Sequence, residues 1–139
     1  MSREQRLLLL LGIYWGEGNK RELNLINSDP ALIKTFLSCL YDMGMKKEEL
    51  RITLRLYDGI DKEKSRRFWA KLLSIRIKDI RNINTIQGNK IGKLKYGMCR
   101  VRVAKSAPYF KLIMSLLSEI KERFNAAVVQ RIEQGTPKP

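Results

Sequence analysis

A single carboxylate, Glu17, stands between two glycines at the end of an apolar stretch that runs from Leu7 to Trp15. If this stretch is helical, Gly18 can take the left-handed conformation that ends a helix, and Glu17 faces the negative pole of the helix dipole. A carboxylate in that position requires a compensating positive charge, and a divalent cation would supply it. The plain alternative is a terminal glutamate that water alone solvates.

Two glycines in the same stretch, Gly12 and Gly16, are four residues apart and therefore share one face of a helix. Without Cβ atoms they form a flat strip that a second helix can approach closely. Two copies packed through this strip would bring two Glu17 carboxylates together. The stretch is too short to span a bilayer, and no small-residue cleavage site follows it, so we expect a core helix of a cytoplasmic protein without membrane contact.

The charge balance of the chain points to a polyanion as its partner. The 139 residues include 28 Lys and Arg against 14 Asp and Glu, a formal net charge of +14, and this length suits one domain with a proper core. For such a domain the expected polyanion is nucleic acid. The chain contains no histidine, which excludes histidine-based acid–base chemistry and zinc sites. Cys39 and Cys99 stand alone in apolar patterns and are expected to be buried thiols.

Hydrophobic periodicity predicts an α+β fold with one small antiparallel sheet and helices packed on one face. Asp29 followed by Pro30 is a strong helix start, Asp61 is expected to cap a further helix, and Leu50 to Tyr57 alternates like a half-buried strand. The helices begin near 2, 30, 62 and 106, and the strands cover 22–27, 50–57, 80–87 and 94–104. Residues 1–124 form the domain, and 125–139 are expected to be a polar tail outside its functional core.

The exposed face of the predicted sheet carries side chains that suit DNA. Arginine reads guanine, asparagine and glutamine read adenine, and an antiparallel ribbon fits the major groove. An ordinary solvated face would carry lysine and glutamate as often as arginine, whereas here four arginines on two strands have no acid among them. The predicted contact residues, with Asn and Gln of 80–87 nearby, are Arg51, Thr53, Arg55, Tyr57, Arg100 and Arg102.

Leu10 to Gly18 resembles the LAGLIDADG motif of homing endonucleases, in the variant that ends in Gly-Glu-Gly. The run from Asn27 to Pro30, followed by an apolar helix, is also similar to what these domains carry. The resemblance implies a saddle-shaped domain that binds duplex DNA, with one motif per chain and therefore a homodimer. Its two-fold axis would run between paired copies of the motif helix. The interface residues that it implies are Leu8, Leu11, Gly12, Trp15 and Gly16.

The resemblance also implies the chemistry of the site. Glu17 falls on the final acid of the motif, so each subunit would contribute its carboxylate and the carbonyl of Gly16 to Mg²⁺ bound against the scissile phosphates. Family members use a lysine near the active site, for which Lys95 or Lys93 is the candidate. Two departures stand out: Trp15 replaces an acid of the consensus, and a single short strand follows the motif where many members have a hairpin.

Other functions fit the same residues. A transcription regulator of the same fold would bind DNA without cutting it, and Glu17 is the residue that argues for cutting. An RNA-binding maturase would use the basic sheet on RNA. A basic globular protein of unrelated function is the fourth interpretation.

Overall fold

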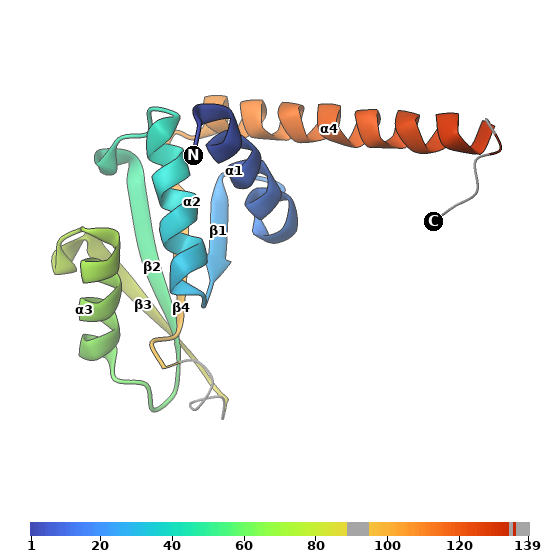
Figure 1. Cartoon of the computed structure of the whole chain (residues 1–139). Coiled ribbons are helices and arrows are strands. Elements are labelled where there is room, and N and C mark those ends of the chain that lie inside the picture. Colours follow the sequence, from blue (N-terminus) through green and yellow to red (C-terminus); the bar gives the residue numbers. More distant parts are fainter. Residues whose placement is uncertain (89–94, 134, 136–139) are drawn as a thin grey trace.

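The computed structural model consists of a four-stranded sheet, helices that cover one of its faces, and a long helix that projects from the body (Figure 1). It describes residues 1–88, 95–133 and 135, apart from the side chains of 127–130. Two three-residue 3₁₀ turns, η1 (Lys47–Glu49) and η2 (Ile77–Asp79), precede two of the strands. The main elements are α1 (Arg3–Glu17), β1 (Asn24–Asn27), α2 (Pro30–Asp42), β2 (Leu50–Tyr57), α3 (Lys62–Leu73), β3 (Ile80–Ile86), β4 (Met98–Val103) and α4 (Ala107–Glu133).

Local signals in the sequence set several of these boundaries. The Asp29 side chain accepts hydrogen bonds from the backbone N–H groups of Ala31 and Leu32 and so caps α2, directly before Pro30. Asp61 caps α3 in the same way by accepting from the N–H of Lys64. Strand β2 occupies the residues predicted for it, with every second side chain buried. The predicted starts of α2, α3 and β2 are therefore confirmed.

The sheet is mixed, with the strand order β1-β4-β2-β3. Strand β4 pairs antiparallel with β1 and β2, but β3 pairs parallel with β2. The prediction of an antiparallel sheet is wrong for this edge strand. The reason lies in the connection between β2 and β3, because α3 carries the chain back to the starting end of β2, and a crossover of this kind joins parallel strands.

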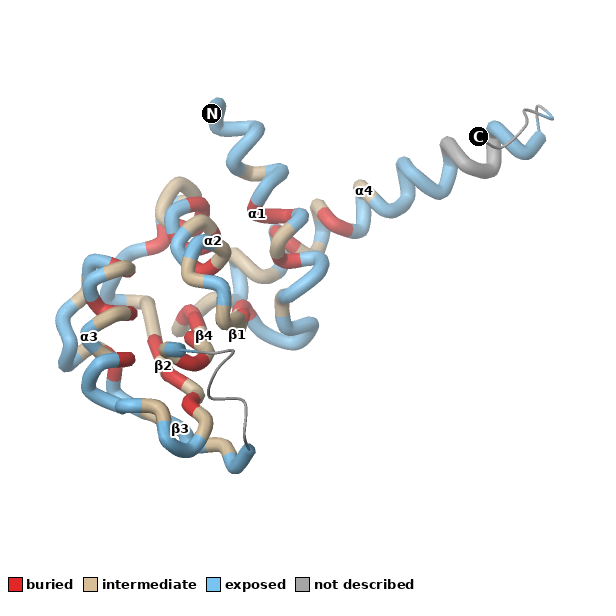
Figure 2. Tube along the Cα trace, turned by 60° about the horizontal axis from the view of Figure 1, so that its bottom comes forward, coloured by how far each residue is buried: buried red, intermediate tan, exposed pale blue. Residues whose placement is uncertain are grey.

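The hydrophobic core lies between the sheet and the helices, where Figure 2 shows the buried residues of both layers facing each other. Trp69 of α3 is fully buried, and its indole N–H donates to the carbonyl of Tyr96 over 2.9 Å. Cys39 and Cys99 are free, buried thiols, as predicted, and burial raises the pKa of both. The helical layer therefore covers one face of the sheet and leaves the other face open.

Helix α4 packs on the body only through its first half. Ile113 and Leu117 are buried, whereas every residue from Lys121 to Ala126 is exposed. The helix continues to Glu133, past residue 124 where the predicted domain ends, and its 27 residues give it a length of about 40 Å. Within the described part of the chain, no helix combines the length and the apolar character that crossing a bilayer requires.

Candidate nucleic-acid interface

The open face of the sheet, the face away from α1, α2 and α3, brings the predicted arginines together. Arg51 on β2 lies directly opposite Arg102 on β4, and Thr53 lies opposite Arg100. The side chains of such pairs stand about 5 Å apart at their Cβ atoms, and like charges in this arrangement destabilise a sheet. Arg55 follows one row further along β2. The predicted surface residues on β2 and β4 therefore form one continuous basic area.

Strand β3 adds Arg81, which the sequence analysis did not select, to this open face, beside asparagines that it expected nearby. Ile52 of β2 pairs with Ile80 of β3, but the next residue, Thr53, pairs with Asn82. Arg81 therefore has no partner on β2 and forms a bulge in β3. Such a bulge places two successive side chains on the same side of a sheet, here Arg81 and Asn82. The signal in the sequence is the spacing of Ile80 and Ile83, three residues apart in a strand whose apolar residues would otherwise alternate.

Several open-face side chains are already held by neighbours. A terminal nitrogen of Arg51, Nη1, donates to the Glu48 carbonyl over 2.7 Å, and Arg102 lies 4.0 Å from the carboxylate of Glu22. Strands β2 and β4 themselves contain no acid, and this one acid beside the arginines comes from the segment that precedes β1. By contrast, Arg55 and Arg100 form no ion pair or side-chain hydrogen bond with any described residue. These two guanidinium groups keep their donors for a ligand.

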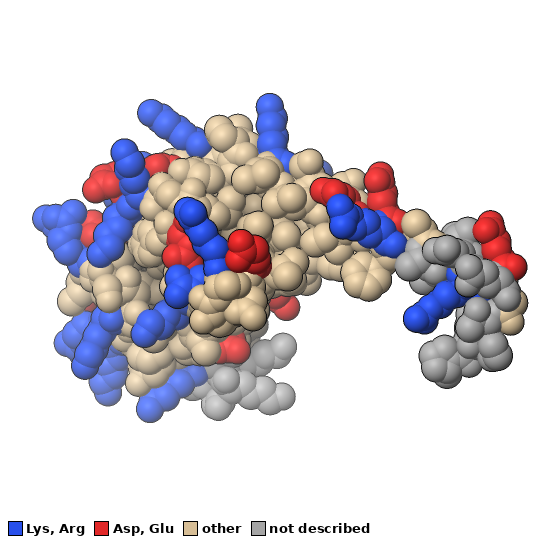
Figure 3. Space-filling model, turned by 45° about the horizontal axis from the view of Figure 1, so that its top comes forward, with Lys and Arg blue, Asp and Glu red and all other residues tan. Residues whose placement is uncertain are grey.

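Lysine and arginine also occur on the rest of the surface. Figure 3 shows them scattered over the visible face, with uncharged residues covering most of it and several Asp or Glu side chains beside the cations. This distribution agrees with the net charge of the chain, and it attracts a polyanion from several directions. The open face differs from the remaining surface because its cations are arginines in fixed register.

The end of α1 is built differently from its prediction. The helix includes Glu17, and Gly18 is extended, with φ −77° and ψ 150°, so the left-handed conformation predicted for it is wrong. Glycine is nevertheless required here, because a Cβ atom on Gly18 would lie 2.5 Å from the ring of Tyr14. The Tyr14 hydroxyl lies within hydrogen-bond distance of the carbonyls of Asn19 and Glu22, and burial raises its pKa. Close packing of a ring, not turn geometry, selects this glycine.

A lysine of the chain itself compensates the negative end of α1. The ammonium group of Lys20 donates to the carbonyl of Trp15 over 2.9 Å and to that of Tyr14 over 3.3 Å. Cations near the C-terminal carbonyls of a helix stabilise it. The helix end therefore has its positive charge without a metal ion, and the dipole argument no longer requires a divalent cation beside Glu17.

The oxygen atoms at the C-terminal end of α1 suit Mg²⁺ as ligands only in part. Glu17 is exposed, and one of its oxygens accepts a hydrogen bond from the Asn27 amide over 3.2 Å, which leaves the second oxygen available. No described residue donates to the exposed carbonyl of Gly16. Mg²⁺ prefers six oxygen ligands, several of them water. Within the described residues no group of three acidic, His or Cys side chains could hold a metal ion, so this end of α1 offers only the free Glu17 oxygen and the Gly16 carbonyl as ligands.

The face of α1 that carries the paired glycines is uncovered. Leu8 and Trp15 are 60% and 44% exposed, and a Cβ atom on Gly12 or Gly16 would meet nothing within 4 Å. We call these four residues the open strip. Leu11, by contrast, is only 3% exposed because its side chain points into the core of its own chain, so its predicted place in a dimer interface is wrong.

The two candidate lysines lie apart from Glu17 or outside the structure. The Lys95 ammonium group lies 5.4 Å from the ring centroid of Tyr96, and that ring stacks on Phe68 of α3. No contact between described residues links Lys95 to Glu17. Lys93 lies outside the described residues. The lysine that the structure does bring to the end of α1 is Lys20, which the sequence analysis did not select because its role depends on the folded turn.

No protein-family model matches the chain, and no significant match appears among curated proteins or solved structures.

Proposed function

We propose that the chain is a homodimeric, Mg²⁺-dependent DNA endonuclease of the homing type, and that its open face is the saddle on which duplex DNA lies. The observation that carries this proposal is the placement of Arg51 directly opposite Arg102, beside Arg55 and Arg100, which have no ion-pair partner among the described residues. Repulsion across the ladder costs stability in the free protein, and the contact of Arg102 with Glu22 at 4.0 Å offsets only part of it. Phosphates of bound DNA would offset the rest, and arginine and asparagine are side chains of the types that read base edges in the major groove.

The open strip of α1 supports the dimer. Its apolar side chains and its two glycines lie on the surface, and α4 covers them only where Lys121 approaches the ring of Trp15 at 5.4 Å. In a two-fold dimer the same patch serves both subunits, so the strip pairs with itself. The pairing brings the two ends of α1, and with them both Glu17 carboxylates, to the same axis.

The residues at that axis have separate roles in phosphodiester hydrolysis. Glu17 and the Gly16 carbonyl of each subunit hold Mg²⁺, and Asn27 orients the Glu17 carboxylate by its hydrogen bond. When bound, Mg²⁺ activates water and neutralises charge on the leaving oxygen. Lys20 compensates the negative end of α1 and so reduces its repulsion of the Glu17 carboxylate.

The test is a cleavage assay on duplex DNA that joins the two flanks of the chain's own gene. The wild-type protein should cut in Mg²⁺ and stop when EDTA removes the metal. Glu17→Gln should bind the same duplex with unchanged affinity and cut no faster than the wild type does without metal. Glu122→Gln is the matched control, because it changes an exposed glutamate on α4 that has no ion-pair partner among the described residues, and it should leave cutting intact. Equal cutting by Glu17→Gln would remove the catalytic assignment.

A DNA-binding regulator without nuclease activity is the second candidate. The contact of Lys20 with the last carbonyls of α1 favours this candidate, because the lysine compensates the negative end of the helix without a metal ion. Specific binding of the duplex by the wild-type protein, with no cutting in Mg²⁺ or Mn²⁺, would select this function.

A further inference from the structure

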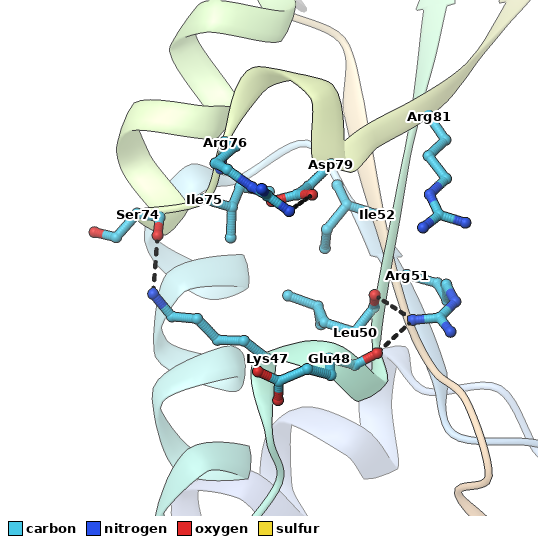
Figure 4. Close-up of a pocket in the computed structure, with 10 residues that line it drawn as sticks. All are labelled: Lys47, Glu48, Leu50, Arg51, Ile52, Ser74, Ile75, Arg76, Asp79 and Arg81. Carbon is cyan, nitrogen blue, oxygen red and sulfur yellow. Dashed lines mark hydrogen bonds and ion pairs between the residues drawn. The ribbon is translucent and has the colours of Figure 1, made fainter.

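A hollow of about 510 Å³ lies at the end of the sheet where β2 and β3 begin, between the turns η1 and η2 (Figure 4). Its floor is apolar and consists of Leu50, Ile52 and Ile75. Its rim carries four cations against two acids, a net charge of two positives. The charged residues of the rim are Lys47, Arg51, Arg76, Arg81, Glu48 and Asp79.

Part of this rim is fixed by contacts within the chain. Two nitrogens of Arg76 donate to the two carboxylate oxygens of Asp79, both over 3.1 Å, which raises the pKa of Arg76 and lowers that of Asp79. The Lys47 ammonium group donates to the Ser74 carbonyl over 3.1 Å and so joins η1 to the end of α3. Because Asp79 pairs with Arg76 and Ser74 binds Lys47, Arg51 and Arg81 are the rim cations that have no acid partner or side-chain link across the hollow among the described residues.

Arg51 and Arg81 come from neighbouring strands and extend on the same side of the sheet (Figure 4). Two backbone carbonyls, those of Glu48 and Leu50, orient the Arg51 guanidinium group through Nη1 and leave its other nitrogens free to donate. Arg81 is the bulged residue of β3, is exposed, and has no ion-pair or hydrogen-bond partner among the described residues. Both arginines line the same hollow, and a tetrahedral oxyanion with several acceptor oxygens can accept hydrogen bonds from more than one guanidinium group.

We propose that Arg51 and Arg81 at this hollow bind a phosphate group. The inference rests on the proposed function for the source of that phosphate, which is the backbone of DNA where it reaches the outer end of the open face. Continuity supports this source, because Arg51 belongs both to the rim and to the Arg51–Arg102 pair of the open face. A free phosphate or a nucleotide is the other source of the same chemistry.

The experiment measures the affinity of the intact protein for duplex DNA as a function of salt. Each phosphate contact contributes about 0.9 to the slope of log K against log salt. Arg81→Gln should therefore reduce the slope by about one and weaken binding about eightfold at 0.1 M salt, equally for all duplex sequences. Arg81→Lys should keep the slope. Arg67→Gln, an exposed arginine on α3, is the matched control.

A second measurement separates the two sources of phosphate. The side-chain N–H signals of the arginines are followed by NMR during titration with inorganic phosphate, and those of Arg51 and Arg81 should shift first. If DNA binds and Arg81→Gln behaves like Arg67→Gln, the phosphate site is overturned and the DNA proposal stands. If DNA does not bind but inorganic phosphate shifts these two signals, the phosphate site stands with a free ligand and the proposed function falls. Absence of both effects overturns both proposals.

Discussion

Helix α1 has two apolar faces, and the chain covers one of them. Leu10 is fully buried in the core, whereas Leu8, on the opposite side of the helix, is largely exposed. The glycines show the same contrast, because a Cβ atom would strike the Tyr14 ring at Gly18 but would meet only open space at Gly12. The face with Leu10 packs against the core of its own chain. The face with Leu8 and Gly12 is exposed, and no described atom lies within 4 Å of a Cβ atom built on Gly12.

The sheet repeats this contrast with different chemistry. Its covered face is apolar, as in Leu54 and Val101, and its open face carries arginines that stand opposite each other. The covered surfaces account for the fold. The surfaces that the chain leaves open, apolar on α1 and basic on the sheet, are those on which the proposed dimer and the proposed DNA complex depend.

The largest effect should come from shortening a leucine on each face of α1. Leu10→Ala removes a fully buried side chain and should lower the free energy of unfolding by about 2–5 kcal/mol, because it leaves a cavity. Leu8→Ala changes an exposed position and should alter the stability of the monomer by no more than about 0.5 kcal/mol. Urea unfolding of both variants at a concentration that keeps the protein monomeric measures the difference. Equal losses would mean that α1 has no open face.

A smaller effect, confined to the open strip, should follow from Gly12→Leu. The structure has room for a side chain at this position, so the monomer should remain folded. In the dimer the added side chain would hold the paired helices apart, at a cost of about 1–3 kcal/mol per copy. Sedimentation velocity should show wild-type dimers and variant monomers with the same circular dichroism spectrum. A variant that stays dimeric would show that the copies pair through another surface.

The smallest effect concerns the basic face. Arg55→Ala should leave the free energy of unfolding unchanged and lower the discrimination between the preferred base pair and others by about 1–3 kcal/mol. Competition binding with duplexes that differ at single base pairs measures this change, and Arg67→Ala on α3 serves as the control. A uniform loss of affinity for all duplexes would mean that Arg55 contacts phosphate and that the open face reads no sequence.

The parts of the fold that could be predicted depend on neighbouring residues. The caps at Asp29 and Asp61 act within three residues of the chain, and the alternation of β2 follows from the two-residue period of a strand. The direction of β3 could not be predicted in this way, since it depends on a crossover through α3 and on pairing with a distant strand.

The site was predicted less completely than the fold for the same reason. The open strip followed from the spacing of Gly12 and Gly16, which is a local property of the helix. The roles of Lys20 and Gly18 depend on a turn that returns to the end of α1. The exposure of Arg81 depends on a bulge that the spacing of Ile80 and Ile83 only indicates and that the strand register establishes. Leu11 was assigned to the wrong face because an apolar run of this length fills both faces of a helix.

The mass of the complex between the wild-type protein and one duplex DNA tests the central claim most directly. Native mass spectrometry of the protein with a duplex from its own locus should give two chains per duplex, and Gly12→Leu should shift the population to one chain. One wild-type chain per duplex, or no complex at low salt, would contradict the claim that the two open surfaces of this chain join a second copy and DNA.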